Sequence, residues 1–207
     1  MIGIVDYGAG NLRNVQAALG RLGARERLVS AAGDLTPGLT ALILPGVGRF
    51  GTAARQLREA GLLRPLREAA LGGRPFLGIC LGMQLLFESS EEDPAAEGLG
   101  VFRTPVRRLA TLRLPHIGWA EVEPRRPAQA IFEGLPRAGF FAYFAHSFAV
   151  PADHPATEAT TDGPPRFASA VSAGTTWGVQ FHPEKSGPEG LKVLANFLAL
   201  AGAEGRA

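Results

Sequence analysis

The chain has 207 residues, of which 46% are hydrophobic and 19% are charged, and its formal net charge is only +2. This composition is that of an ordinary globular protein and excludes a disordered chain. No run of five or more like charges occurs, which argues against a nucleic-acid partner, and the longest apolar runs are too short to cross a membrane.

The chain contains one cysteine, which excludes an intrachain disulfide. Its first residues, MIGIVDYG, lack the basic segment and long apolar stretch of a secretory signal. We therefore expect a reducing, cytoplasmic compartment. The length suits one domain, and we expect residues 1–207 to form it.

Strands and helices are predicted to alternate in the first part of the chain. Short apolar runs predict buried strands at residues 2–5, 41–44 and 76–79, and a further strand is expected at residues 27–30. Helices are predicted at residues 12–22, 52–71 and 81–88. Gly61 and Pro65 are expected to divide or kink the second helix. The alternation predicts an α/β fold with a parallel, doubly wound sheet.

From about residue 100, short segments bounded by proline and glycine predict antiparallel strands added to this sheet. These segments are residues 101–109, 120–123, 140–146, 167–171 and 175–181. Residues 188–201 are predicted to close the chain as an amphipathic helix. Its apolar side is expected to carry Leu191, Leu194, Ala195 and Leu198.

Cys80 stands where the strand at 76–79 is predicted to run into a helix, in the sequence FLGICLGMQ. Gly78 and Gly82 flank it at two residues' distance, as expected where a turn is too sharp for side chains. A helix start favours a thiolate, and it leaves the backbone N–H of Leu81 free to stabilise an oxyanion. The pattern predicts a catalytic cysteine at a nucleophile elbow; the alternative is a buried structural cysteine.

A base and a group that orients it are predicted in the sequence GVQFHPEKS at residues 178–186. Pro183 favours an extended backbone at His182, and residues two apart in an extended chain point to the same side. The carboxylate of Glu184 is therefore expected to reach the imidazole. Cysteine chemistry needs such an oriented base, whereas the alternative is a surface histidine with a carboxylate nearby.

Three further features lie where a ligand is expected to bind. The sequence PGVG (residues 45–48) follows a buried strand, and its glycines allow backbone N–H groups to turn toward an oxyanion, although a simple turn is the alternative. Gln84 lies on the same helix face as Cys80 and offers an amide to a ligand or to solvent. The acidic residues at 91–93 offer carboxylates for an α-ammonium group, or form a solvated face.

Two other kinds of site are disfavoured. The sequence GAG at residues 8–10 lacks the third glycine of a dinucleotide-binding fingerprint, and no phosphate-binding Gly-Lys-Ser/Thr loop occurs. A metal site built from His116, His146 and His182 would match no tight ligand spacing. We expect neither a cofactor nor a metal.

The motifs PGVG, GICLGMQ and HPEKS, in this order, resemble those of the class I (triad-type) glutamine amidotransferases. The segments IVDYGAGNLRNV, HIGW and YFAHSF narrow the resemblance to the glutaminase subunits of imidazole glycerol phosphate synthase, an enzyme of histidine biosynthesis. The resemblance implies a flavodoxin-like fold and hydrolysis of L-glutamine through a cysteine thioester. It further implies a heterodimer with a (β/α)₈-barrel cyclase subunit, which receives the ammonia and completes a carbon–nitrogen lyase.

The resemblance also implies roles for particular residues. Cys80 would be the nucleophile, His182 the base and Glu184 the group that orients it. Val47 and Leu81 would supply the N–H groups of an oxyanion hole. The glutamine site would include Gly46, Gly48, Gln84, Glu92, Ser147 and Phe148. The residues facing the partner would be Trp119, Tyr143 and Lys185.

Two positions depart from the family pattern: Ile117 replaces a frequent methionine, and Ala120 replaces a frequent asparagine near the partner. The alternatives to this reading are a glutaminase subunit of another pathway, such as pyridoxal phosphate synthesis, and a stand-alone cysteine amidase or peptidase. A third is a flavodoxin-like binding module with a disabled triad, against which the presence of all three triad residues argues.

Overall fold

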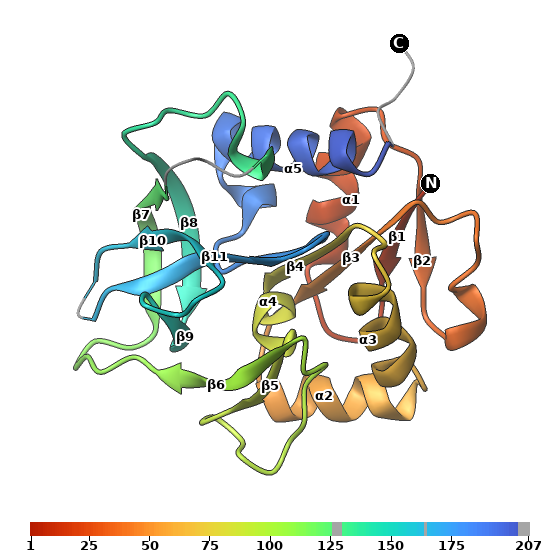
Figure 1. The fold of residues 1–207 in the computed structure, drawn as a ribbon, viewed down its shortest axis with the longest axis horizontal. Helices are drawn as coiled ribbons and strands as arrows, with labels where there is room; N and C mark the ends of the chain where they lie inside the picture. The colour runs from red at the N-terminus through yellow and green to blue at the C-terminus, as the bar shows by residue number, and fades with distance from the viewer. Residues whose placement is uncertain (126–129, 164, 203–207) are drawn as a thin grey trace.

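The computed structural model describes residues 1–125, 130–163 and 165–202, in which a 12-stranded sheet carries helices on both faces (Figure 1). Residues 203–207 of the expected domain lie outside these ranges. No helix within them is both long enough and apolar enough to cross a membrane.

The strands of the first half are β1 (Ile2–Val5), β2 (Glu26–Val29), β3 (Ala41–Gly46), β4 (Phe76–Cys80), β5 (Phe87–Ser90) and β6 (Phe102–Arg108). Those of the second half are β7 (His116–Pro124), β8 (Phe140–His146), β9 (Phe148–Pro151), β10 (Thr157–Thr161), β11 (Phe167–Ala173) and β12 (Thr176–Val179). The α-helices are α1 (Leu12–Arg21), α2 (Phe50–Glu59), α3 (Leu63–Leu71), α4 (Leu81–Leu85) and α5 (Gly187–Leu200). Three 3₁₀ turns are η1 (Ala32–Asp34), η2 (Ala130–Phe132) and η3 (Pro183–Lys185).

The sheet has a parallel half and an antiparallel half. The strand order is β2-β1-β3-β4-β12-β11-β10-β7-β8. Neighbours from β2 to β12 pair in parallel, and neighbours from β12 to β8 pair antiparallel. A branch made of β5, β6 and β9 joins at β11. The predicted fold class, a mostly parallel sheet with added antiparallel strands, is confirmed.

Each face of the sheet has its own hydrophobic cluster, because the parallel strands are apolar on both sides. On one face, Val15 and Leu19 of α1 belong to the same cluster as Phe197 of α5. On the other face, Phe50 of α2 and Leu66 of α3 belong to a second cluster. Figure 1 shows the two groups of helices on opposite sides of the strands. Burial on both faces explains why β1, β3 and β4 are continuous apolar runs.

The predicted helix at residues 81–88 is wrong in its second half. Helix α4 ends at Leu85, and Phe87 begins a strand that pairs with β6. Phe87 is fully buried, and its ring centroid lies 4.8 Å from that of Phe102. Pairing with a distant strand therefore overrides the local helical pattern. Strands β9 and β10 were also not predicted.

The predicted division of the second helix is confirmed at Gly61, whose φ of 68° ends α2. Pro65 does not break α3, because it lies in the first turn of that helix, where a backbone N–H has no carbonyl acceptor within the helix. The closing helix α5 buries Leu194 and Leu198 as expected, but it also buries Val193 and Phe197.

The register of three parallel strands brings the predicted motifs together. Gly46, at the end of β3, is paired with Cys80, at the end of β4. On the other side of β4, Val179 of β12 is paired with Ile79, so His182 follows at the same edge. The carboxyl ends of three neighbouring strands thus meet where ligands bind in sheets of this kind.

Candidate functional site

Cys80 lies at a strained turn between β4 and α4. Its φ of 54° and ψ of −109° make it the one non-glycine residue with positive φ among the described residues. Such a conformation costs about 1–3 kcal/mol and persists only where the surroundings enforce it. A Cβ added to Gly78 would lie 2.6 Å from the carbonyl oxygen of Gly82, and one on Gly82 would lie 1.7 Å from that of Leu44. The two glycines are therefore required by close backbone packing.

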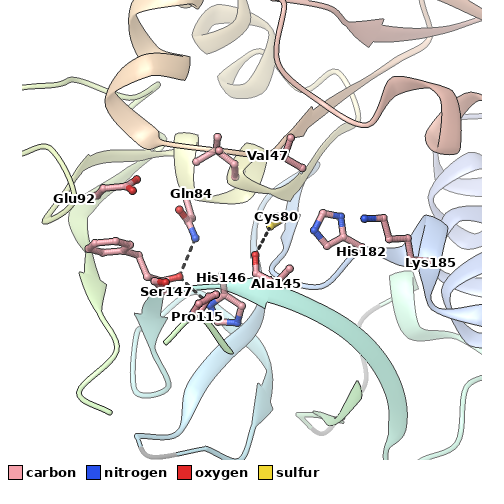
Figure 2. Close-up of a pocket in the computed structure, with 13 residues that line it drawn as sticks. Val47, Cys80, Gln84, Glu92, Pro115, Ala145, His146, Ser147, His182 and Lys185 are labelled. Atoms are coloured by element: carbon pink, nitrogen blue, oxygen red, sulfur yellow. Dashed lines mark hydrogen bonds between the residues drawn. The ribbon is translucent and has the colours of Figure 1, made fainter. Parts of the chain in front are cut away.

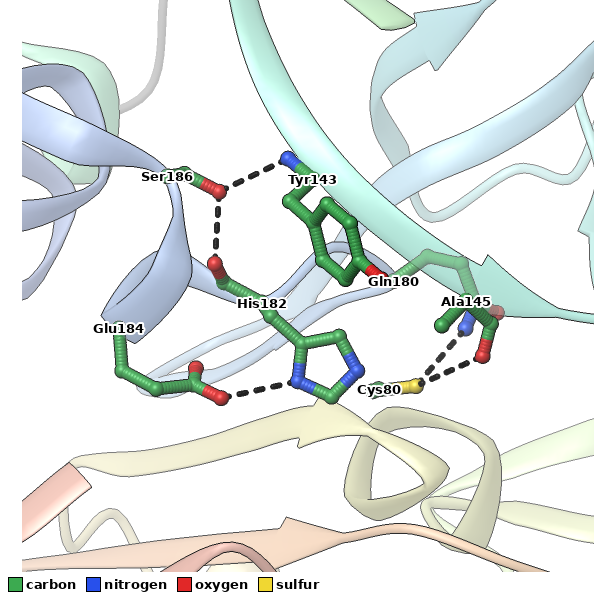
Figure 3. A network of polar contacts seen from close by, with 7 residues as sticks. All are labelled: Cys80, Tyr143, Ala145, Gln180, His182, Glu184 and Ser186. Atoms are coloured by element: carbon green, nitrogen blue, oxygen red, sulfur yellow. Dashed lines mark hydrogen bonds and ion pairs between the residues drawn. The ribbon is translucent and has the colours of Figure 1, made fainter. Parts of the chain in front are cut away.

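His182 and Glu184 form a buried pair beside the thiol (Figure 3). The Nδ1 atom of His182 lies 2.9 Å from Oε1 of Glu184, and the two side chains are 3% and 1% exposed. His182 has the expected extended backbone, with φ −99° and ψ 94°. Glu184, however, lies in the 3₁₀ turn η3 that Pro183 begins. The carboxylate thus reaches the imidazole from a tight turn, and an extended chain is not needed.

Three hydrogen bonds hold the loop that carries His182. The Ser186 hydroxyl donates to the carbonyl of His182 at 2.6 Å and accepts from the backbone N–H of Tyr143 at 2.9 Å. The backbone N–H of His182 donates to the carbonyl of Tyr143 at 2.9 Å. The imidazole is therefore anchored to strand β8 as well as to Glu184.

The pKa of His182 is raised to about 9. Burial is the largest single effect and by itself lowers the pKa. It is outweighed by the hydrogen bonds and charges of Cys80 and Glu184 together, which favour the imidazolium. The contacts of the site thus favour a protonated His182.

A cavity of about 250 Å³ opens in front of Cys80 (Figure 2). Two residues of the predicted triad, Cys80 and His182, line this cavity, and Lys185 lines it too. Most residues predicted to surround the glutamine or the oxyanion also line it, namely Val47, Gly48, Leu81, Gln84, Glu92, Ser147 and Phe148. Gly46 does not line it; a Cβ there would lie 2.6 Å from the Tyr7 hydroxyl and 2.9 Å from Cβ of Leu81.

Gln84 and Glu92 are already engaged by the protein. The Gln84 amide nitrogen donates to the carbonyl of Phe148 at 2.8 Å and to Oε1 of Gln180 at 3.1 Å. This uses both N–H groups and leaves the Gln84 carbonyl oxygen for a ligand. Glu92 accepts the backbone N–H of Phe50 at 2.7 Å, at the start of α2.

Three polar side chains around the site were not predicted to belong to it. Tyr7 donates to the carbonyl of Pro45 at 3.2 Å, and burial, together with Cys80, raises its pKa. His146 lines the cavity, and burial lowers its pKa to about 3. Gln180 is fully buried, with its amide nitrogen 3.7 Å from the sulfur of Cys80. Gln180 and His146 stood within quoted motifs, and only their three-dimensional contacts separate them from ordinary core residues.

The three residues expected to face a partner lie together beside His182. The rings of Trp119 and Tyr143 are 6.4 Å apart, and Nζ of Lys185 lies 5.5 Å from the Tyr143 ring centroid. Trp119 is 56% exposed. The Tyr143 ring in turn lies 6.2 Å from the His182 imidazole. An exposed apolar surface thus begins next to the base.

No group of three or more metal-ligating side chains is placed to hold an ion in the part of the chain that the structure describes. His116 and His146 are neighbours, with ring centroids 5.3 Å apart, and they pack edge-on against Phe167. They are part of an aromatic cluster in the antiparallel half of the sheet.

Comparisons with known proteins found matches along nearly the whole chain. The family model described as glutamine amidotransferase class-I matches residues 3–201. The imidazole glycerol phosphate synthase subunit HisH of Moorella thermoacetica is 46% identical over 200 residues, 95% of this chain and 93% of that protein. The HisH subunit of Symbiobacterium thermophilum is 48% identical over 196 residues, 94% of this chain and 91% of that protein. A crystal structure of a glutamine amidotransferase, 27% identical, superposes with a TM-score of 0.77 and covers 97% of this chain and 98% of its own.

Proposed function

Because the chain belongs to the glutamine amidotransferase class-I family, we propose that it is the glutaminase subunit of an imidazole glycerol phosphate synthase. It hydrolyses L-glutamine to glutamate and ammonia and delivers the ammonia to a (β/α)₈-barrel cyclase subunit. The observation that carries the proposal is the strained Cys80 beside the buried His182–Glu184 pair, with Cys80 and His182 lining one cavity.

The first half-reaction forms a thioester. The proton of the Cys80 thiol passes to Nε2 of His182, and the sulfur attacks the side-chain carbonyl carbon of glutamine. The backbone N–H groups of Val47 and Leu81 stabilise the oxyanion that forms. The imidazolium then gives its proton to the departing nitrogen, so that ammonia leaves as the carbon–nitrogen bond breaks. Glu184 keeps the imidazole in the tautomer that accepts at Nε2.

The second half-reaction releases glutamate. His182 takes a proton from water, and the resulting hydroxide oxygen attacks the thioester carbonyl. The carbon–sulfur bond breaks, and the sulfur leaves as a thiolate that recovers the proton from His182. Glu184 favours the imidazolium in both half-reactions, whereas the charge of the Cys80 sulfur favours it only while that sulfur is not part of the thioester.

The exposed surface formed by Trp119, Tyr143 and Lys185 supports the proposed heterodimer. Its Tyr143 ring lies against the His182 imidazole, and Trp119 and Lys185 both contact that Tyr143 ring. A partner that covers this surface would therefore receive ammonia within a few side chains of the place where it is released. Neighbouring Ile117 and Phe141 are 62% and 59% exposed, which extends the apolar area on the β7–β8 hairpin.

The test is copurification with a barrel cyclase, followed by glutamine turnover of the chain alone, of the complex, and of the complex with the cyclase's ligand. We expect the lone chain to be a poor glutaminase, because free ammonia would escape. Losing one oxyanion donor costs roughly a hundred- to thousandfold in rate, so a movement of the loop at residues 45–48 suffices as a switch. A lone chain that turns over as fast as the liganded complex would favour a stand-alone amidase.

A further inference from the structure

The sulfur of Cys80 has a second polar neighbour besides His182. The side-chain amide nitrogen of Gln180 lies 3.7 Å from Sγ, while the carbonyl oxygen of Ala145 lies 3.9 Å from it (Figure 3). Gln180 is fully buried and does not line the cavity. Its amide therefore approaches the nucleophile from the protein interior, on the side away from the substrate.

The orientation of this amide follows from a chain of contacts that ends at a backbone carbonyl. The carbonyl oxygen of Phe148 can only accept, so the end of Gln84 that lies 2.8 Å from it must be the NH₂ group. The same NH₂ group lies 3.1 Å from Gln180, and the facing atom of Gln180 must then be its oxygen. The remaining end of the Gln180 amide, the NH₂ group, is the one directed at the sulfur.

A second donor also binds the Phe148 carbonyl, at which this series of hydrogen bonds ends. His146 has its Nδ1 atom 3.0 Å from the same Phe148 carbonyl. Because burial lowers the pKa of His146, its imidazole is neutral and must carry the proton on Nδ1 to make this bond. Both donors hold the Phe148 carbonyl in place, and Gln84 and Gln180 are themselves enclosed. Neither amide can reverse without placing two oxygens or two NH₂ groups face to face.

We propose that Gln180 stabilises the Cys80 thiolate by donating an amide N–H to Sγ, and that the Phe148 carbonyl enforces this through Gln84. The charged sulfur accepts more strongly than the thiol or the thioester. The bond therefore favours deprotonation before attack and favours the departure of sulfur when the thioester breaks. The consequence for turnover rests on the proposed glutaminase function, whereas the effect on the thiol itself does not.

The test uses the single cysteine of the chain, whose alkylation by iodoacetamide reports on one thiolate. The rate is measured against pH for the full chain and for Gln180→Met and Gln180→Leu, which keep a side chain of similar length or volume but cannot donate. We expect alkylation at pH 7 to slow by about tenfold and the midpoint of its pH dependence to rise by about one unit.

The titratable groups facing the sulfur must be separated from this effect. They are His182, with Glu184 behind it, and Tyr7, whose pKa is raised by burial and by Cys80. Tyr7 therefore stays neutral over the titration. Repeating the comparison in a His182→Ala background removes the imidazole, and the upward shift caused by Gln180→Met should persist there.

Asn196→Leu is the matched control for losing a buried amide. Its side chain donates to the carbonyls of Ile131 and Glu133, away from the site. This variant should lose stability without moving the alkylation midpoint. If neither Gln180 variant folds, Gln84→Met decides, since it removes the group that orients the Gln180 amide and should also raise the midpoint. An unchanged midpoint in the folded variants overturns the proposal.

Glutamine turnover by the complex separates this inference from the proposed function. Gln180→Met should lower kcat and leave KM unchanged, because Gln180 does not line the cavity. If the unaltered complex shows no glutaminase activity while the alkylation midpoint still responds to Gln180, the proposed function fails and this inference stands. If the unaltered complex is active and Gln180→Met has the same kcat and the same alkylation midpoint, this inference fails while the proposed function stands.

Discussion

Replacing Glu184 with glutamine tests how the site controls its base. The carboxylate accepts from Nδ1 of His182 at 2.9 Å, while its other oxygen, Oε2, is buried and has no hydrogen-bond partner in the described part of the chain. A glutamine can keep the first contact with its carbonyl oxygen. Its NH₂ group then occupies the place of Oε2, which no donor contacts in the described part of the chain. The imidazole stays in position but faces a neutral group.

The expected size of the effect follows from the loss of charge. A hydrogen bond to a charged group is worth about 1.5–3 kcal/mol and a neutral one about 0.5–1.5 kcal/mol. The difference, about 1–1.5 kcal/mol, lowers the pKa of His182 from about 9 by roughly one unit. Turnover of glutamine should fall further than this pKa change alone predicts, by about 10⁴-fold, which is the loss seen when the carboxylate of another triad becomes an amide. His182→Ala should cost about 10⁶-fold.

The pKa is measurable by NMR without assigning every histidine. The chain has four histidines, and burial lowers the pKa of the other three, His116, His146 and His154. The one imidazole that titrates on the alkaline side of pH 6.5 is therefore His182. A pKa unchanged by Glu184→Gln, or a loss of turnover equal to that of His182→Ala, would refute the assigned role.

The same variant should alter how stability depends on pH. His182 has a higher pKa folded than unfolded, so its contribution is fully present below pH 6.5 and is lost as pH rises through about 9. The shift corresponds to a contribution on the order of 3 kcal/mol. Urea unfolding at pH 6.5 and pH 9 should show a smaller decline for Glu184→Gln than for the unaltered chain.

Two further predictions concern the scaffold. Gly82→Ala should lower Tm by about 2–12 °C or prevent folding, because its Cβ would lie 1.7 Å from the Leu44 carbonyl oxygen. The control Gly20→Ala has open space around the new Cβ and should not destabilise the chain. Equal Tm values for the two variants would contradict the packing argument. The pKa of His146 is lowered to about 3, so its contribution is present above pH 6.5 and is lost as pH falls toward 3. His146→Phe should therefore reduce the acid-induced loss of stability in urea unfolding between pH 6.5 and pH 4, and an equal loss would refute it.

The parallel half of the fold was predictable because each step is local. An apolar run ending in a glycine-rich turn predicted β1, β3 and β4, and the same pattern placed Cys80 at an elbow. The reason for Gly82 was harder to anticipate in detail, since the contact that requires it comes from Leu44 on a neighbouring strand. Phe87 was assigned to a helix because its pairing partner lies beyond an intervening loop.

The site was predictable where its residues are close in sequence and not where distant strands combine. His182, Pro183 and Glu184 form one short motif, so their contact could be expected, although the turn that makes it was not. Gln180 gave no signal of its own, because its environment is created by Gln84 of α4 and, through it, by Phe148 of β9, which are far away in sequence. The conformation and burial of Gln180, and not its residue type, distinguish it from other polar residues of the core.

Cys80→Ala in the complex tests the central claim most directly. Glutamine-dependent formation of product and glutamine hydrolysis should both fall by orders of magnitude, because the chain has no second cysteine to act as nucleophile. Product formation from added ammonium should persist at the unaltered rate, since that chemistry belongs to the cyclase subunit. Substantial glutamine hydrolysis by the Cys80→Ala complex would contradict the account.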